Sequence, residues 1–294
     1  MDTKVIPSIL DINNDYLEFY DYVSKTQRIE KRLESFENYI SFHYKDLFYI
    51  KAVLGDLANI KTIVDIGCCG TPYPDLFALE TVDYIGIDIS QISLDRMAEV
   101  YKDKKIKWVV DDICKLNSLS DNSVDLILAT QVFEHVPNPE EALIATVSKL
   151  KIGGRLMIGT EAALFISTSL TSRLGRWLTG VSFYLGSIAA VYGTEPLFYL
   201  HRETLTFTDS QGNSKTVKIP HGHFHPRYFQ VIIDEYNLPA KITFVRVTDG
   251  IRPDNYFKQY GSNIYFKWLE AKSKIPVLRY LGNQIFIVIE KLES

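Results

Sequence analysis

The chain has 294 residues, of which 46% are hydrophobic and 23% are charged, and these values are ordinary for a folded protein. The formal net charge is -4, so a broad basic surface for binding nucleic acid is not expected. The three cysteines, Cys68, Cys69 and Cys114, lack zinc-type spacing, which argues against a structural metal and favours a reducing compartment.

The N-terminal part of the chain is expected to be helical. Its first residues, MDTKVIPSILDINNDY, contain no basic stretch followed by a long apolar run, so we expect no secretory signal and a cytoplasmic protein. Apolar residues recur between residues 33 and 51 at the spacing of an amphipathic helix. We therefore expect residues 1–58 to form an N-terminal helical lid.

Residues 59–160 show the pattern of an α/β core. Five short runs rich in β-branched residues alternate with stretches long enough for helices, which predicts a doubly wound parallel sheet. The runs are KTIVDIG, DYIGIDIS, IKWVVDD, VDLILAT and RLMIGTE. A helix between the last two runs is marked by Asn138 as N-cap, Pro139 at its first position and Glu141 in a capping box.

Residues 161–225 are expected to form a cap inserted into this core. TLTFT and KTVKI flank DSQGNS and predict a β-hairpin that turns around Gly212 and Asn213. Residues 177–194 carry no charge, but they include three glycines and several hydroxyl residues. We interpret them as a buried helix or pocket lining in preference to a membrane span, and we expect no stable membrane insertion.

Residues 226–294 are expected to return to the core. Pro226 opens the predicted helix RYFQVIIDEYNL, and ITFVRV and NQIFIVIEKL predict two final strands. The aromatic-rich insertion 252–282 contains DNYFKQYGSNIYFKW, which suits either a pocket wall or a subunit interface. The oligomeric state is therefore left open.

A glycine turn after the first run predicts a site for a nucleotide-like cofactor. The turn begins at Gly67, and Asp88 ends the second run 21 residues later, where an acid commonly binds ribose hydroxyls. This spacing suits both NAD and S-adenosylmethionine. Asp65 favours S-adenosylmethionine, because a carboxylate beside the turn would repel a pyrophosphate and attract an ammonium or sulfonium group.

At these residues the sequence resembles class I S-adenosylmethionine-dependent methyltransferases, particularly the group that includes quinone-biosynthesis enzymes. VDIGCCGT, YIGIDIS, VVDDIC, DLILATQVFEHV and LKIGGRLMIGT follow one another in the family's order. The resemblance implies that the cofactor is held by Asp65, Gly67, Cys69, Gly70, Asp88, Ile89, Asp112, Ile113 and Gln131.

The first motif departs from the family pattern D-x-G-x-G-x-G. Cys69 and Thr71 occupy the third and fourth positions, and Gly70 falls one place away. Either Gly70 supplies the left-handed conformation after a small shift, or the turn is one residue longer. We interpret the adjacent cysteines as small packing residues, because no neighbouring histidine or lysine would activate a thiol.

Candidates for the acceptor side of the site are histidines and their neighbours. His135 is a possible general base, although the resemblance is equally consistent with a structural role. HGHFHPRYF contains His221, His223 and His225, for which we expect a role in substrate binding or proton removal. No acid or cysteine adjoins them in sequence, so we expect no metal; Glu134 and Tyr228 are the predicted substrate contacts.

Together these features predict a Rossmann-like seven-stranded sheet of five parallel strands and a reversed C-terminal pair, with the lid and cap. The resemblance implies methyl transfer to a small or medium acceptor, with O-methylation of a hydroxyl or carboxyl in secondary or cofactor metabolism preferred. N-methylation of a small molecule or peptide is the alternative, followed by carbon methylation. An NAD-dependent oxidoreductase and a methyltransferase-like binding protein without catalysis are the other classes considered.

Overall fold

The computed structural model describes residues 17–22, 59–69, 73–161, 198–209, 211–248, 271, 274–275 and 284–293. Several sequence-based predictions lie outside these residues. They concern the helix at 33–51, the uncharged run at 177–194, most of the insertion at 252–282, and Gly70.

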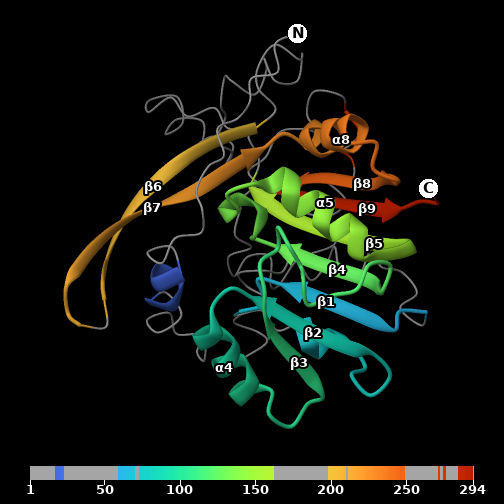
Figure 1. Ribbon diagram of the computed structural model, residues 1–294. Coiled ribbons are helices and arrows are strands. Elements are labelled where there is room, and N and C mark those ends of the chain that lie inside the picture. Colours follow the sequence, from blue (N-terminus) through green and yellow to red (C-terminus); the bar gives the residue numbers. More distant parts are fainter. Residues whose placement is uncertain are drawn as a thin grey trace.

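The core is a seven-stranded sheet with the strand order β3-β2-β1-β4-β5-β9-β8 (Figure 1). The first five strands are parallel to their neighbours in the order, and β9 is antiparallel to both β5 and β8. The strands are β1 (Thr62–Ile66), β2 (Asp83–Asp88), β3 (Ile106–Val110), β4 (Val124–Thr130), β5 (Leu150–Glu161), β8 (Ala240–Thr248) and β9 (Gln284–Lys291). The predicted fold class is confirmed.

The helices lie where the sequence pattern predicts or allows them. They are α4 (Gln91–Val100), α5 (Pro139–Lys149) and α8 (Pro226–Glu235), with 3-10 turns η1 (Tyr73–Leu76) and η2 (Phe133–His135). Asn138 caps α5 as predicted, because its side chain accepts a hydrogen bond from the Glu141 N–H at 3.3 Å. None of the helices in the described part of the chain is long and apolar enough to cross a membrane.

The sheet is covered on both faces, which explains why its central strands are apolar. One hydrophobic cluster joins the sheet to α5 and α8 and includes Val64, Ile127 and Phe229. A second cluster on other sheet residues includes Ile63 and Leu128. Side chains alternate along each strand, so β1 contributes to both clusters. This burial keeps the strand ends in a rigid arrangement.

A long hairpin extends from the core as a curved arm (Figure 1). It consists of β6 (Phe198–Thr208) and β7 (Ser214–Phe224), which pair over eleven positions. The predicted hairpin is therefore confirmed, with strands longer than expected. The helical segment 17–22 packs on the hairpin: Phe19 joins Phe207 and Val217, and Lys215 pairs with Glu18 at 2.6 Å.

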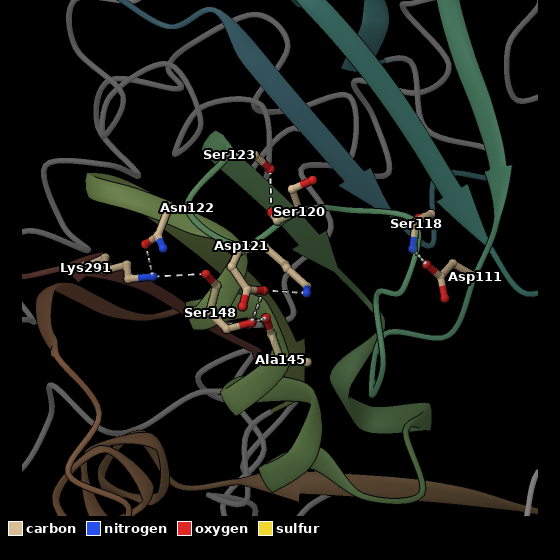
Figure 2. A network of polar contacts seen from close by, with 10 residues as sticks. Asp111, Ser118, Ser120, Asp121, Asn122, Ser123, Ala145, Ser148 and Lys291 are labelled. Carbon is tan, nitrogen blue, oxygen red and sulfur yellow. Dashed lines mark hydrogen bonds and ion pairs between the residues drawn. The ribbon is translucent and has the colours of Figure 1, made fainter.

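Polar contacts tie the last strand to the amino edge of the sheet (Figure 2). The Lys291 ammonium donates to Asn122 Oδ1 at 2.8 Å and to the Ser148 carbonyl at 3.0 Å. The Lys149 ammonium donates to the Asp121 carboxylate at 2.6 Å. This network joins β9, the end of α5 and the loop before β4, at the opposite ends of the strands from the residues that the sequence marks as functional.

Candidate functional site

The carboxyl ends of the parallel strands meet at one edge of the sheet, where ligands bind in open α/β folds. Here β1 leads into Gly67, β2 ends at Asp88, β4 leads into Gln131 and β5 ends at Glu161. The structure therefore brings together at this edge residues that the sequence motifs mark separately.

Gly67 forms a tight turn directly after β1. Its φ is +65°, and a Cβ at this position would lie 2.4 Å from Val132 Cγ2. Its N–H donates to the Ile87 carbonyl at 2.8 Å, which fastens the turn to the end of β2. A side chain is therefore excluded on conformational and steric grounds. Cys69, partly buried, follows in this turn.

Asp65 is buried within the sheet beside this turn, with 1% of its surface exposed. One of its carboxylate oxygens accepts a hydrogen bond from the Tyr84 hydroxyl at 2.9 Å. Burial, together with the neighbouring Asp65 carboxylate, raises the pKa of Tyr84 well above its ordinary value. The tyrosine therefore stays a hydrogen-bond donor, and the pair links β1 to β2.

Asp88 ends β2 with its carboxylate partly buried. Its Oδ1 accepts a hydrogen bond from the Ser90 N–H at 2.9 Å, and the Ser90 hydroxyl donates to Asp21 at 2.6 Å. Burial raises the pKa of Asp88 despite these bonds. Ile89, the next residue, packs against the cluster formed by the helical segment and the hairpin. The helical segment 17–22 and the β6–β7 hairpin thus approach this end of the edge.

Asp112 and Ile113 lie after β3. Asp112 Oδ1 accepts a hydrogen bond from the Cys114 N–H at 3.0 Å, and Ile113 is buried with 6% exposed. Asp111 accepts from the N–H groups of Asp112 and Ser118, both at 2.8 Å (Figure 2 shows the second contact). Burial would raise the pKa of Asp111, but these bonds outweigh it and the pKa is lowered. Both carboxylates therefore shape this loop.

Gln131 follows β4 in a strained conformation, with a φ of +57°. Its N–H donates to the Gly159 carbonyl at 2.6 Å. Its side-chain Nε2 is buried and has no hydrogen-bond partner among the described residues. Strain in a residue other than glycine and a buried unsatisfied donor both suit a ligand site. The amide donor fits an oxygen of a bound cofactor or acceptor.

Glu134 lies in η2 with 1% of its surface exposed. Its Oε2 accepts a hydrogen bond from the Thr160 hydroxyl at 2.8 Å. Burial raises the pKa of Glu134 to about 8, in spite of the hydrogen bonds that favour its ionised form. The carboxyl group is therefore mostly protonated at neutral pH.

Two histidines of β7 meet Glu161 at the end of β5. His221 Nε2 lies 3.1 Å from Glu161 Oε2, and His223 Nδ1 lies 3.3 Å from the same oxygen. Burial would raise the pKa of Glu161, but His221, His223 and His135 lower it. No acid adjoins these histidines in sequence, but folding places the Glu161 carboxylate beside both of them.

His135 lies beside this group. Its ring centroid is 5.2 Å from that of His221, with an interplanar angle of 89°, and 6.5 Å from that of Tyr20. The structure therefore brings His135 and His223 together, as expected for joint members of a site. It also adds Glu161, which the predicted site lacked, and brings His221 of the histidine motif into contact with it. The sequence signal that could have identified Glu161 is an acid at the end of a buried strand, a position that Asp88 also has.

His225 and Tyr228 are in different surroundings. His225 is fully buried and caps α8, because its Nδ1 accepts a hydrogen bond from the Arg227 N–H at 3.1 Å. Burial lowers the pKa of His225 to about 4, so its ring is neutral. Tyr228 is 7% exposed and packs against Phe224 and Phe229. We therefore assign both residues to the support of α8, and the function proposed below does not use them.

The adjacent cysteines have the character of packing residues. Cys68 is fully buried, and burial raises its pKa well above the ordinary value. Burial also raises the pKa of Cys69. Thiols with raised pKa values are poor nucleophiles at neutral pH. None of the three cysteines forms a disulfide bond, and Cys114 has its pKa raised to about 12, chiefly by burial.

Comparisons with known proteins agree with this arrangement. Residues 64–158 match the family described as "Methyltransferase domain". A curated ubiquinone biosynthesis O-methyltransferase of Photobacterium profundum is 25% identical over 125 residues, which cover 42% of this chain and 48% of that protein. The protein of the same name from Coxiella burnetii is 23% identical over 170 residues, covering 56% and 68%. The aligned part is about half the length of most of these relatives.

Solved structures share the fold at low sequence identity. A putative S-adenosylmethionine-dependent methyltransferase from Listeria monocytogenes has a TM-score of 0.52 and 14% identity, covering 86% of this chain and 99% of that one. An S-adenosylmethionine-dependent methyltransferase from Mesorhizobium loti has a TM-score of 0.51 and 13% identity, covering 84% and 97%. The family match agrees with the resemblance seen in the motifs, and the solved structures confirm the fold.

Proposed function

Because residues 64–158 form a class I S-adenosylmethionine-dependent methyltransferase domain, we propose that the protein transfers a methyl group from S-adenosylmethionine to a small or medium organic acceptor. The observation that carries this proposal is the carboxyl edge itself. There the tight turn at Gly67 and the acid Asp88 occupy the ends of adjacent parallel strands.

The residues at this edge fit the cofactor. The Gly67 turn leaves room for the methionine part, and Asp88 would accept hydrogen bonds from the ribose hydroxyls. Ile89 and Ile113 are apolar residues suited to the adenine face, and the Gln131 amide offers a buried donor. When bound, the cofactor supplies an already activated methyl group on its sulfonium, so the protein has to orient the acceptor and exclude water.

We propose O-methylation as the reaction, supported by two features. The curated relatives are O-methyltransferases by name. His135 lies in η2 at the end of the edge beside β4, where its imidazole could accept the proton of an acceptor hydroxyl. The lid (1–58) and the cap (161–225) would close over the acceptor, and the contacts of Phe19 and Asp21 with the hairpin and Ser90 support this arrangement.

Titration calorimetry on the full chain tests the proposal. We expect S-adenosylmethionine and S-adenosylhomocysteine to bind and NAD not to bind. Asp88→Asn should weaken binding about 10- to 100-fold, since hydrogen bonds to a charged group are lost. Asp83→Asn is the matched control: Asp83 begins the same strand, is exposed, and should not affect binding.

Failure of both sulfur compounds to bind would contradict the proposal. Tight binding without methyl transfer to any of a broad panel of hydroxyl, carboxyl and amine compounds would favour the alternative of a binding protein that keeps the fold. An amine as the best acceptor would replace O-methylation by N-methylation.

A further inference from the structure

Glu161, His221 and His223, which we call the Glu161 cluster, have the composition of a metal site. His221 and His223 are two residues apart on β7, so their side chains lie on the same face of the strand. Glu161 is the last residue of β5. The side chains are partly buried, with exposed fractions of 14%, 21% and 33% for His221, His223 and Glu161. The cluster is thus shielded but reachable.

The distances within the cluster suit a shared ion. One ligand atom from each residue can be chosen so that all lie within 4.8 Å of one another. The two nitrogen-to-oxygen separations are 3.1 and 3.3 Å. With metal–ligand bonds of about 2.0–2.1 Å, neighbouring ligand atoms in a tetrahedral shell lie about 3.3 Å apart. Two of the three distances between ligand atoms therefore already match those expected when all three residues bind the same ion.

The donor set selects the kind of ion. Two imidazole nitrogens and one carboxylate oxygen are typical ligands of divalent transition metals, whereas Mg²⁺ and Ca²⁺ prefer oxygen ligands alone. Three protein ligands of this type also leave a position open for water or a substrate atom, as in catalytic zinc sites. A closed structural site would need a fourth side chain.

We propose that Glu161, His221 and His223 bind one divalent transition-metal ion, with Zn²⁺ favoured by the donor set, and that its open position faces the acceptor. The ring of His135 packs against His221, and η2, which contains His135, follows β4 at the same edge of the sheet. The ion would therefore lie on the acceptor side of the edge, apart from the cofactor residues Gly67 and Asp88.

The role of the ion rests on the proposed function. A bound dication lowers the pKa of an oxygen ligand and fixes its position. An ion at the Glu161 cluster would therefore select acceptors that present a hydroxyl or similar oxygen, with His135 close by to take up the proton. Binding of the metal itself does not depend on methyl transfer, so the two can be tested separately.

The test is a Zn²⁺ titration of the full chain after treatment with a chelator, read by competition with a chromophoric chelator. Co²⁺ is added in parallel as a spectroscopic probe, because its visible absorption reports a site of nitrogen and oxygen ligands. We expect one equivalent to bind. His221→Ala, His223→Ala and Glu161→Gln should each weaken binding at least 10-fold, and the double histidine variant should abolish it.

Two control variants distinguish the site from general effects. Glu290→Gln removes a partly exposed carboxylate that pairs with Lys241 on β8, and His225→Asn removes the histidine that caps α8 while keeping a capping side chain. Both should bind Zn²⁺ as the unaltered chain does. Glu161→Gln is nearly isosteric, so its effect is readable even if a histidine variant unfolds.

The proposal is overturned if Zn²⁺ binds with no defined stoichiometry, or if the double histidine variant retains one equivalent. Calorimetry with S-adenosylhomocysteine on the same samples separates this failure from that of the methyltransferase assignment. If the unaltered chain binds S-adenosylhomocysteine but no Zn²⁺, the Glu161 cluster is an ion-pair network only, and the proposed function is unaffected.

Discussion

The proposed cofactor end of the carboxyl edge, at Gly67 and Asp88, and its proposed acceptor end, at Glu161 and His221, are assembled in different ways. At the cofactor end, Gly67 and Asp88 terminate adjacent strands and are 21 residues apart in the chain. At the acceptor end, Glu161 and His221 are separated by 60 residues and meet only because the hairpin folds back on the end of β5. Local sequence spacing therefore encodes the first end, and tertiary packing creates the second.

Gly67→Ala should give the largest effect, because it disrupts the turn at the cofactor end. The new Cβ would lie 2.4 Å from Val132 Cγ2 in a backbone with φ of +65°. We expect the free energy of unfolding to fall by about 2–4 kcal/mol from strain and overpacking, and binding of S-adenosylhomocysteine to be lost. Urea unfolding and calorimetry measure these effects.

Gly212→Ala is the matched control for that variant. Gly212 has φ of +86° in the hairpin turn, and a Cβ there would meet no atom within 4 Å. Only the cost of the backbone conformation remains, so we expect the free energy of unfolding to fall by about 1 kcal/mol. Cofactor binding should be unchanged. An equal effect of the two variants would show that contact with Val132 plays no part.

Glu134→Gln should change how the free energy of unfolding depends on pH. Glu134 lies in η2, at the carboxyl edge of the sheet. Burial raises the pKa of Glu134 from 4.5 to about 8, so the folded chain binds a proton more tightly than the unfolded chain. Stability is therefore lost as pH rises through this range. The variant cannot ionise, and we expect it to remove this loss, which is of the order of a few kcal/mol at pH 8.

Thermal unfolding between pH 5 and pH 8.5, in the presence of a chelator, measures this difference. Glu161 contributes to raising the pKa of Glu134, and His221 opposes this effect. Glu290→Gln serves as a control for a carboxylate outside the site. Parallel curves for Glu134→Gln and the unaltered chain would mean that Glu134 is ionised when folded.

The sequence predicts the features that depend on local residue spacing, and it does not predict the contacts that tertiary packing creates. VDLILAT was recognisable as β4 because it is apolar and buried on both faces, and Asn138 marked the start of α5 through its capping chemistry. The pairing of Glu161 with His221 and His223 could not be read from spacing, because it depends on where the hairpin lies. His225 shows the converse: it shares the histidine motif but caps a helix.

Lys291→Met should produce a smaller effect. This residue lies at the opposite edge of the sheet, so the variant tests whether contacts there influence the carboxyl edge. The variant removes the hydrogen bonds to Asn122 and Ser148 shown in Figure 2. We expect a loss of about 1 kcal/mol in the free energy of unfolding, measured with urea. Binding of both S-adenosylhomocysteine and Zn²⁺ should be unchanged, and a loss of either would show that the edges are coupled.

Cys69→Ser should give the smallest effect. Cys69 lies in the cofactor turn, but we expect its contribution to come from its backbone, because burial raises the pKa of its thiol. The dissociation constant of S-adenosylhomocysteine should change by no more than about twofold, because serine is close to cysteine in size and leaves the backbone unaltered. A loss of binding would assign the sulfur atom a direct role.

The most direct test of the central claim is a crystal structure of the full chain with S-adenosylhomocysteine. We expect the homocysteine part to lie over the turn at Gly67 and the ribose hydroxyls to donate to the Asp88 carboxylate. A ligand bound away from both residues would contradict the claim that the ends of β1 and β2 form the cofactor site.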